Sequence, residues 1–437
     1  MDGFIDNQGN FGADGIVGPH HEKEGSFYTI KQLWSPVQIM NTSVDKQFDG
    51  KFSVENRYDF LNLNTCRFLW KQVKFPTATD ASNTTAQVLK QGEVQGSDVA
   101  AHSAGVLDIK TTILPDADAL FLTAIDRYGH ELWRWTFPVN KLNQANEVLS
   151  PLSNKVTSTE TENELTVKAK NHTFIFSKKD GQLKGVSVNN RKISFANGPR
   201  FIGARRADRS LDQFYNHDDE KAKEKDRTYS EFPDATVFTK LDVKEDGGNL
   251  IVTANYKLGN LDKVQWTINP NGEAVLDYTY NFSGVVDLMG ICFDYPEDQV
   301  ISKRWLGAGP YRVWQNRIHG TQYDVWENDY NDPIPGETFT YPEFKGYFGS
   351  VSWMNIRTKE GTISLTNETP DAYIGVYQPR DGRDRLLYTL PESGISVLNV
   401  IPPVRNKVNS TDLCGPSSQP KWVNGPQSGR IIFRFME

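Results

Sequence analysis

Cysteine is scarce in this chain of 437 residues, which contains only Cys66, Cys292 and Cys414. A disulfide framework needs several cysteines in a short chain, and a zinc cluster needs paired ligands at short spacing. Three widely separated cysteines exclude both kinds of site. We therefore expect all three side chains to be buried thiols.

Long apolar runs are also missing. A membrane-spanning helix needs about 20 consecutive apolar residues, whereas no run approaches that length and the mean hydropathy is −0.55. We expect a soluble protein with no membrane partner. Residues 1–6 lack the basic and apolar regions of a secretion leader. The compartment stays open: either the protein is cytosolic, or the chain is a piece of a longer protein, which could be periplasmic or extracellular.

Neither sign of charge dominates the chain. The 48 Lys and Arg residues oppose 55 Asp and Glu residues, which gives a net charge of −7. No basic stripe is present, so nucleic acid is not an expected partner. The sequence also has no glycine-rich phosphate loop, no Gly-x-Ser-x-Gly turn and no histidine pairing beyond His20 and His21. Acidic residues are too abundant to single out a catalytic pair.

Aromatic residues are abundant instead, at 12% of the chain. Their flat rings can stack on the apolar faces of sugars, but they also suit pleated strands and fill the cores of sheets. Composition alone favours the core interpretation. A chain of this length buries roughly three quarters of its surface on folding, and its length predicts about two or three domains.

Periodicity predicts one helix followed by many strands. An apolar stripe with helical spacing runs through residues 24–34, and Pro36 follows as a stop. From about residue 48 the period changes to two, as between Trp133 and Phe137. Residues 36–140 hold enough short runs of this kind for a sandwich of about seven strands.

A polar segment divides the strand-rich region into two parts. Residues 141–163 have few large apolar side chains, so they predict a linker. Alternation resumes after it, most clearly in a hairpin over residues 264–280 with a turn at 269–272. Residues 164–437 therefore predict a long β domain of two large stacked sheets. The dense charges of residues 217–227 predict a solvated loop or a short exposed helix without a function.

Two stretches mix aromatic rings with charged and turn-forming residues. They are residues 305–317 and 341–347. Sugars need hydrogen-bonding groups beside a flat apolar surface, so these side chains could form one sugar or carboxylate site. The alternative is that Gly and Pro form turns at a domain interface, with Arg317 paired to a carbonyl or a nearby acid. The residue pattern alone favours this alternative.

These segments resemble consecutive parts of one family of enzymes. Residues 14–31 (DGIVGP, then EGSFYTIK) resemble the end of the catalytic TIM barrel of glycoside hydrolase family 2 enzymes of the large β-galactosidase type. Residues 55–68 (ENRYDF, then CRF) resemble the immunoglobulin-like domain that follows. Residues 305–317 and 341–343 (WLGAGPYRVWQNR and YPE) resemble the terminal supersandwich, a fold also seen in galactose mutarotases.

The resemblance implies an all-β fold class. Its parts would be a barrel remnant with one helix over residues 1–35, an immunoglobulin-like β-sandwich over 36–140, a linker over 141–163 and a two-sheet, galactose-mutarotase-like supersandwich over 164–437. Enzymes of this family are retaining glycosidases, which need two glutamates about 5 to 5.5 Å apart. Both belong to barrel strands that would precede this chain, so we expect no catalytic residue in it.

The resemblance also suggests neighbours of an active site. Phe11 and Asp14 match positions that border the sugar subsite, and Asp14 would supply part of a site for sodium or calcium, which bind oxygen ligands. No cofactor is required. The position of a galactose-stacking Trp matches Val397, which has no ring, so the resemblance does not extend to galactose specificity and the sugar stays open. The candidate carbohydrate-binding residues are Phe11, Asp14, Trp305, Tyr311, Trp314, Asn316, Arg317 and Glu343.

Three functions follow as hypotheses. The first is a non-catalytic C-terminal portion of a retaining exo-β-glycosidase, with carbohydrate, the catalytic barrel and a second copy of the chain as expected partners. The second is a free-standing carbohydrate-binding module that uses the rim from Trp305 to Tyr347. The third is an aldose epimerase, which needs a general acid and a general base. Its candidate residues are His172, His217, His319 and Glu343, and we expect no such activity.

Overall fold

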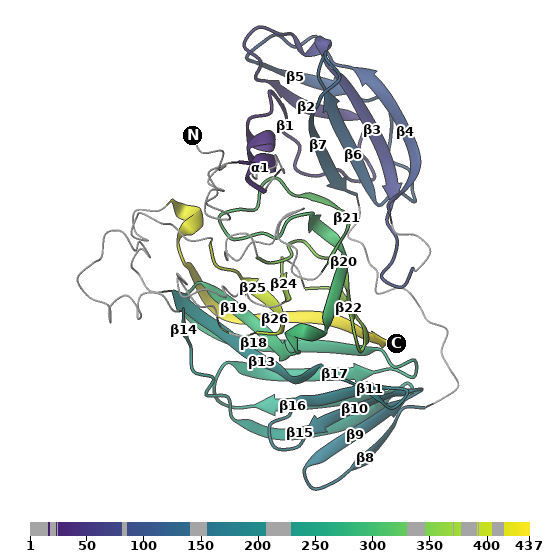
Figure 1. Ribbon diagram of the computed structural model, residues 1–437, viewed down its shortest axis with the longest axis vertical. Helices are drawn as coiled ribbons and strands as arrows, with labels where there is room; N and C mark the ends of the chain where they lie inside the picture. Colours follow the sequence, from purple (N-terminus) through teal and green to yellow (C-terminus); the bar gives the residue numbers. More distant parts are fainter. Residues whose placement is uncertain are drawn as a thin grey trace, which may run out of the picture.

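The computed structural model describes most of the chain: residues 16–17, 23, 25–80, 85–139, 155–206, 229–329, 346–369, 371–376, 391, 393–403 and 415–437. These residues form one α-helix, 26 β-strands and three short 3-10 helices. The prediction of an all-β chain with one helix near its start is therefore confirmed. Figure 1 shows a smaller β-sandwich at one end of the long axis and a larger one below it.

Helix α1 (Gly25–Leu33) lies where the apolar stripe predicted a helix over residues 24–34. The amide of Trp34 still donates to the carbonyl of Ile30 at 2.9 Å, and the chain then leaves the helix before Pro36. No residue of α1, all of which the structure describes, is buried. Its apolar side chains are therefore only partly covered by the described part of the chain.

The first sandwich contains seven strands in two sheets around one core. One sheet has the order β1 (Val37–Ile39), β2 (Lys51–Asn56), β5 (Ser103–Asp108). The other has the order β4 (Gln87–Gln95), β3 (Arg67–Lys74), β6 (Ala119–Ile125), β7 (Glu131–Pro138). Residues from both sheets, such as Phe52 and Phe68, are fully buried between them. The immunoglobulin-like assignment of this sandwich stays a prediction.

Strand β6 departs from simple alternation because both of its faces are covered. Leu120 and Leu122 point into the core of the first sandwich. Ala119 and Phe121 point the opposite way and pack against the large sandwich. Successive strand residues face opposite sides, so a strand between two cores has apolar residues at consecutive positions.

The large sandwich consists of two sheets. The ten-stranded sheet has the order β24 (Tyr373–Val376), β25 (Ile395–Val400), β19 (Leu288–Asp294), β13 (Ala196–Arg206), β11 (Leu183–Val188), β10 (His172–Ser177), β9 (Glu164–Ala169), β8 (Thr157–Glu160), with β12 (Arg191–Ile193) beside β11 and β14 (Tyr229–Glu231) beside β13. The nine-stranded sheet has the order β15 (Phe238–Asp246), β16 (Asn249–Tyr256), β17 (Leu261–Ile268), β18 (Ala274–Val286), β26 (Lys421–Met436), β23 (Gly361–Asn367), β22 (Trp353–Thr358), β20 (Val300–Gly309), β21 (Gln322–Asp329).

Aromatic rings fill the space between these two sheets. Phe195 and Phe293 stack with centroids 4.5 Å apart, and both contact Phe433 from the opposite sheet. The large aromatic content of the sequence is therefore mostly core material, as its composition suggested. A half-buried polar contact also joins distant segments: Glu360 accepts hydrogen bonds from Ser194 Oγ at 2.7 Å and from Tyr295 Oη at 3.0 Å.

Several sequence expectations need correction or fall outside the described residues. Strand β8 lies within the segment 141–163 that composition predicted as a linker, because its four residues are polar and exposed. Strand β26 begins at Lys421, and its largely polar first half gives no alternating apolar signal. Cys66 and Cys292 are buried thiols, as predicted. Cys414 and the charged residues 217–227 lie outside the described residues.

Candidate functional site

Trp305, the first predicted sugar-binding residue, belongs to the core. It lies on β20, is fully buried, and packs edge-on against Phe348 with ring centroids 4.8 Å apart. Its indole N–H donates to the carbonyl of Ala308 at 3.0 Å. The sequence placed it in a turn-rich rim because of the neighbouring glycines, but strand alternation points it inward. Trp305 therefore offers no ring face to a sugar.

Trp314 is buried as well, on the outer side of the ten-stranded sheet. Its ring packs edge-on against Tyr347 at a centroid distance of 5.7 Å, within a cluster that includes Leu288 and Leu398. The indole is fully buried. The expectation that Trp314 stacks on a sugar is thus wrong, because neighbouring side chains of the same chain already cover its ring.

Tyr311 connects the loop after β20, residues 310–321, to helix α1. Its ring lies 5.0 Å from that of Tyr28, and its hydroxyl points to the carbonyl of Lys23 at 3.5 Å. Burial, and then the neighbouring Tyr28, raises the pKa of Tyr311. The phenol therefore stays protonated at neutral pH and acts here as a packing and hydrogen-bonding group.

The same loop makes two further contacts with α1. Thr29 Oγ1 donates to the carbonyl of His319 at 2.9 Å, and the amide of Gly320 donates to Gln32 Oε1 at 2.6 Å. Gly320 has a φ of 88°, and a Cβ there would lie 2.6 Å from the amide nitrogen of Thr29. Only glycine combines that backbone conformation with such a close approach. The loop thus contacts the helix at Tyr28, Thr29 and Gln32.

Asn316 and Arg317 are half-buried and belong to a tight turn. The backbone of Arg317 exchanges hydrogen bonds with that of Trp314 at 2.9 and 3.2 Å. Asn316 Nδ2 donates to Ser418 Oγ at 3.0 Å, and Gln315 Nε2 donates to the carbonyl of Ser417 at 2.9 Å. The turn is therefore attached to the segment just before β26.

The described structure brings four of the eight predicted carbohydrate-binding residues together. Tyr311, Trp314, Asn316 and Arg317 share one loop, whereas Trp305 lies in the core. Phe11, Asp14 and Glu343 lie outside the described residues. The loop 310–321 connects α1, the ten-stranded sheet and the segment before β26. The interface interpretation of its Gly and Pro residues accounts for these contacts.

A second junction, which sequence reasoning missed, joins the two sandwiches. Trp353 is fully buried between them, and its indole N–H donates to the carbonyl of Pro76 at 3.1 Å. Arg134 forms an ion pair with Asp324 at 3.0 Å, and its guanidinium lies 4.7 Å from the centre of the Phe121 ring. Burial raises the pKa of Asp324, and Arg134 opposes that rise. The alternation of apolar residues in β20–β22 alone could not reveal that the first sandwich covers the outer face of these strands.

Those of the remaining candidate residues that the structure describes do not converge on a reaction centre. Val397 points into the core between the large sheets, so its position is not a stacking position here. His172 is half-buried and stacks on Phe174, its Nε2 lies 2.8 Å from the carbonyl of Phe435, and partial burial lowers its pKa. His319 is exposed beside α1, and His217 lies outside the described residues.

Buried titratable groups elsewhere are also held in inert forms. Burial raises the pKa of Cys292 to about 11, although Arg200 opposes the rise. The thiol therefore stays protonated at neutral pH and is a poor nucleophile. Within the residues that the structure describes, no group of three or more His, Cys, Asp or Glu side chains could hold a metal ion. The described helices include none with the length and apolar content to cross a membrane.

Comparisons with known proteins find that the chain is similar to part of a glycosidase. Residues 168–400 match the family model described as beta galactosidase small chain. A beta-galactosidase from Priestia megaterium is 22% identical over 388 residues, which cover 84% of this chain and 35% of that protein. The chain thus spans about a third of the length of this curated relative.

Solved structures give more distant matches. The galactose 1-epimerase of Lactobacillus acidophilus is 9% identical, with a TM-score of 0.35, and the match covers 64% of this chain and 98% of that one. A cycloalternan-forming enzyme from Listeria monocytogenes is 8% identical, with a TM-score of 0.20, and the match covers 92% of this chain and 30% of that one.

Proposed function

Because the chain belongs to the beta galactosidase small chain family, we propose that it is the C-terminal, non-catalytic portion of a retaining exo-β-glycosidase. In this role it supports a catalytic barrel and shapes the rim of the sugar site. The family match over residues 168–400 carries the proposal. The chain's share of the matching beta-galactosidase, about a third, fits a portion of a larger enzyme.

Helix α1 supports the same role as a docking element. Leu33 and Trp34 at its end are exposed, with 48% and 79% of their surfaces accessible. Large apolar side chains exposed side by side mark interaction surfaces. The loop 310–321 and Lys31, which pairs with Glu131 at 2.8 Å, hold the helix in place. We propose that a catalytic barrel covers this apolar end.

Hydrolysis assays test the non-catalytic part of the proposal. The purified chain alone is expected to release no nitrophenol from aryl β-galactosides or β-glucosides above the uncatalysed rate, because retaining hydrolysis requires two positioned carboxyl groups. Turnover that scales with the concentration of the chain would overturn the proposal.

Reconstitution tests the supporting part. The chain is mixed with a separately expressed family 2 barrel polypeptide from the same source, and complex formation and aryl β-glycoside hydrolysis are measured. We expect the mixture to co-elute and to hydrolyse faster than the barrel alone. Trp34→Ala should weaken both effects, while Trp422→Ala, which removes an equally exposed indole elsewhere, should leave them unchanged. A barrel that is equally active with and without the chain would contradict the role.

A bound cation and a second copy of the chain are also proposals within this functional hypothesis. Asp14 would contribute one oxygen ligand for sodium or calcium, with the barrel supplying others. A homo-oligomer and an exported parent enzyme are consistent with a family of carbohydrate-degrading enzymes. The burial of Trp305 and Trp314 does not favour the free-standing binding module that relied on their rings. No contact of His172 favours an epimerase.

A further inference from the structure

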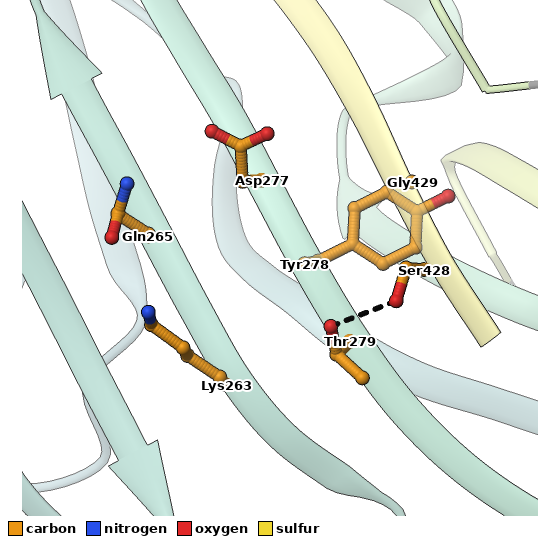
Figure 2. A pocket seen from close by; sticks show the side chains of 7 residues that line it. All are labelled: Lys263, Gln265, Asp277, Tyr278, Thr279, Ser428 and Gly429. Atoms are coloured by element: carbon orange, nitrogen blue, oxygen red, sulfur yellow. Dashed lines mark hydrogen bonds between the residues drawn. The ribbon is translucent and has the colours of Figure 1, made fainter. Parts of the chain in front are cut away.

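The outer face of the nine-stranded sheet carries a polar groove. It has a volume of about 260 Å³ and lies across β17, β18 and β26. Figure 2 shows Lys263 and Gln265 on β17, Asp277 and Thr279 on β18, and Ser428 on β26. The groove shares no residue with loop 310–321. Its lining is Lys263, Gln265, Asp277, Tyr278, Thr279, Ser428 and Gly429.

The strand register brings these side chains together. Gln265 is directly opposite Asp277, Lys263 is opposite Thr279, and Thr279 is opposite Ser428. The hydroxyl groups of Thr279 and Ser428 lie 3.0 Å apart. Directly opposed side chains in antiparallel strands lie about 5 Å apart, so the five groups form one compact patch on a rigid sheet.

The chemistry of the groove matches a neutral ligand with many hydroxyl groups. Lys263 supplies donors, Asp277 supplies acceptors, and the amide and hydroxyl groups supply both. Asp277 also accepts from Arg430 Nη1 at 3.1 Å, which fixes its carboxylate. Two positive groups, Lys263 and Arg430, are balanced by two carboxylates, Asp277 and the Glu368 that pairs with Arg430 Nε at 3.1 Å. The patch therefore has no net charge with which to select a phosphate or a cation. A sugar hydroxyl, which both donates and accepts, can bond to every member of the set.

The same face continues along β26 to an exposed indole. Exposure alternates along this strand: Asn424 and Ser428 are exposed, whereas Val423 packs against the core between the sheets. Trp422 is on the exposed side and is 71% accessible. Ser428 lies six positions farther along β26, which corresponds to about 20 Å along the strand.

Polar side chains connect the indole with the groove. Ser283 Oγ donates to Asn424 Oδ1 at 2.8 Å across the β18–β26 pair, directly between the two. We call the surface that extends from the groove to Trp422 the platform. It is a row of hydroxyl and amide groups with a flat apolar ring at one end. Binding sites commonly combine an aromatic surface with a few fixed polar groups.

We propose that this row binds an extended neutral oligosaccharide. One sugar residue sits in the groove and forms hydrogen bonds with Lys263, Asp277 and Thr279, and a residue farther along the glycan stacks on Trp422. The span of about 20 Å requires a chain of several sugar residues rather than a monosaccharide. The site would hold the polymer from which short glycans are released, a function beyond support of a barrel.

Calorimetry with neutral hexasaccharides tests the proposal. The probes are cellohexaose, xylohexaose, mannohexaose and a β-galactan hexaose, with hexagalacturonate as an anionic comparison and the corresponding monosaccharides as short ones. We expect at least one neutral hexasaccharide to bind at millimolar concentration or below, and its monosaccharide to bind far more weakly.

Two variants locate the binding on the platform. Trp422→Ala and the double variant Lys263→Met/Thr279→Val should each weaken binding by about tenfold or more. Matched controls are Trp34→Ala, which removes the 79% accessible indole at the end of α1, and Lys240→Met, which removes another exposed lysine from β15 of the same sheet. Both controls should bind the hexasaccharide as the parent chain does. All substituted side chains are on the surface, so circular dichroism and the urea midpoint should stay unchanged.

Three results would overturn the proposal. One is that no neutral hexasaccharide binds at millimolar concentration. Another is that binding survives either Trp422→Ala or the double variant, because the proposal needs both ends of the row. The third is that only hexagalacturonate binds and that added salt abolishes the binding, which would indicate charge attraction rather than recognition of hydroxyl groups. Each result is independent of whether the chain supports a barrel.

Discussion

The two ends of the nine-stranded sheet share one inner core but differ on their outer face. At the β20–β22 end the outer side chains are apolar, as Leu306 and Trp353 show, and the first sandwich covers them. At the β17–β18 end they are Gln265, Asp277 and Thr279, and solvent reaches them. The comparison shows that the outer face of a strand indicates whether another layer covers it, because burial of uncompensated polar groups is costly.

The largest expected effect comes from removing the central side chain of the covered end. Trp353→Ala should lower the free energy of unfolding by about 3 to 5 kcal/mol, because it deletes a fully buried indole and its bond to Pro76. Urea unfolding followed by fluorescence measures the change. The matched variant at the open end, Gln265→Ala, should cost far less. Equal losses of unfolding free energy for the two variants would show that the covered and the open end do not differ in their contribution to stability.

A buried ion pair lies on the outer face between the two ends. Arg434 Nε and Glu273 Oε1 are 2.5 Å apart, with 9% and 13% of their side chains accessible. Arg434→Met should cost about 3 kcal/mol, since it leaves the Glu273 carboxylate buried without its cation. Adding Glu273→Gln should recover part of the loss in the same urea experiment. If Arg434→Met lowered the free energy of unfolding by less than about 1 kcal/mol, the pair would behave like a solvent-exposed ion pair.

The junction between the sandwiches should depend on pH through Asp324. Burial raises the pKa of this carboxyl in the folded chain, so the folded state holds its proton more tightly than the unfolded state does. Its contribution to stability is complete below the unfolded pKa and is lost as the pH rises through the raised folded pKa. The parent chain should therefore gain stability relative to Asp324→Asn as the pH falls from neutral to about 4. A parallel pH dependence of the two chains in urea unfolding would contradict this expectation.

The smallest effect is expected at the open end. Thr279→Val replaces a partly exposed hydroxyl, bonded only to Ser428, with a β-branched side chain that suits a strand. The free energy of unfolding should change by no more than about 0.5 kcal/mol. A loss as large as that of Trp353→Ala would mean that the groove is part of the structural core.

Much of the fold could be predicted from local pattern. The strands of the first sandwich, the hairpin of β17 and β18, and helix α1 all lie where apolar spacing put them. The pattern failed where strands are largely polar, as in β8 and the first half of β26. Their hydrogen bonds to neighbouring strands hold them, and such pairing leaves no apolar signal in the sequence.

The candidate site was harder to predict because glycine has two uses. Gly307 and Gly309 suggested turns beside Trp305, but both lie within β20. A Cβ on Gly309 would lie 2.4 Å from the ring of Trp326, and one on Gly307 would lie 3.0 Å from the carbonyl of Gly349. These glycines permit close packing between elements far apart in sequence. Such tertiary contacts are not visible in a local pattern, so Trp305 was placed on a rim instead of in the core.

The position of β26 affects how the chain reaches its native state. It comes after every other described strand, yet it lies between β18 and β23 in the middle of its sheet. During synthesis on the ribosome, both of those strands must wait with an unpaired edge until β26 emerges. Unpaired edges invite intermolecular association. Loss of β26 would therefore split the sheet at its centre rather than shorten it at one side.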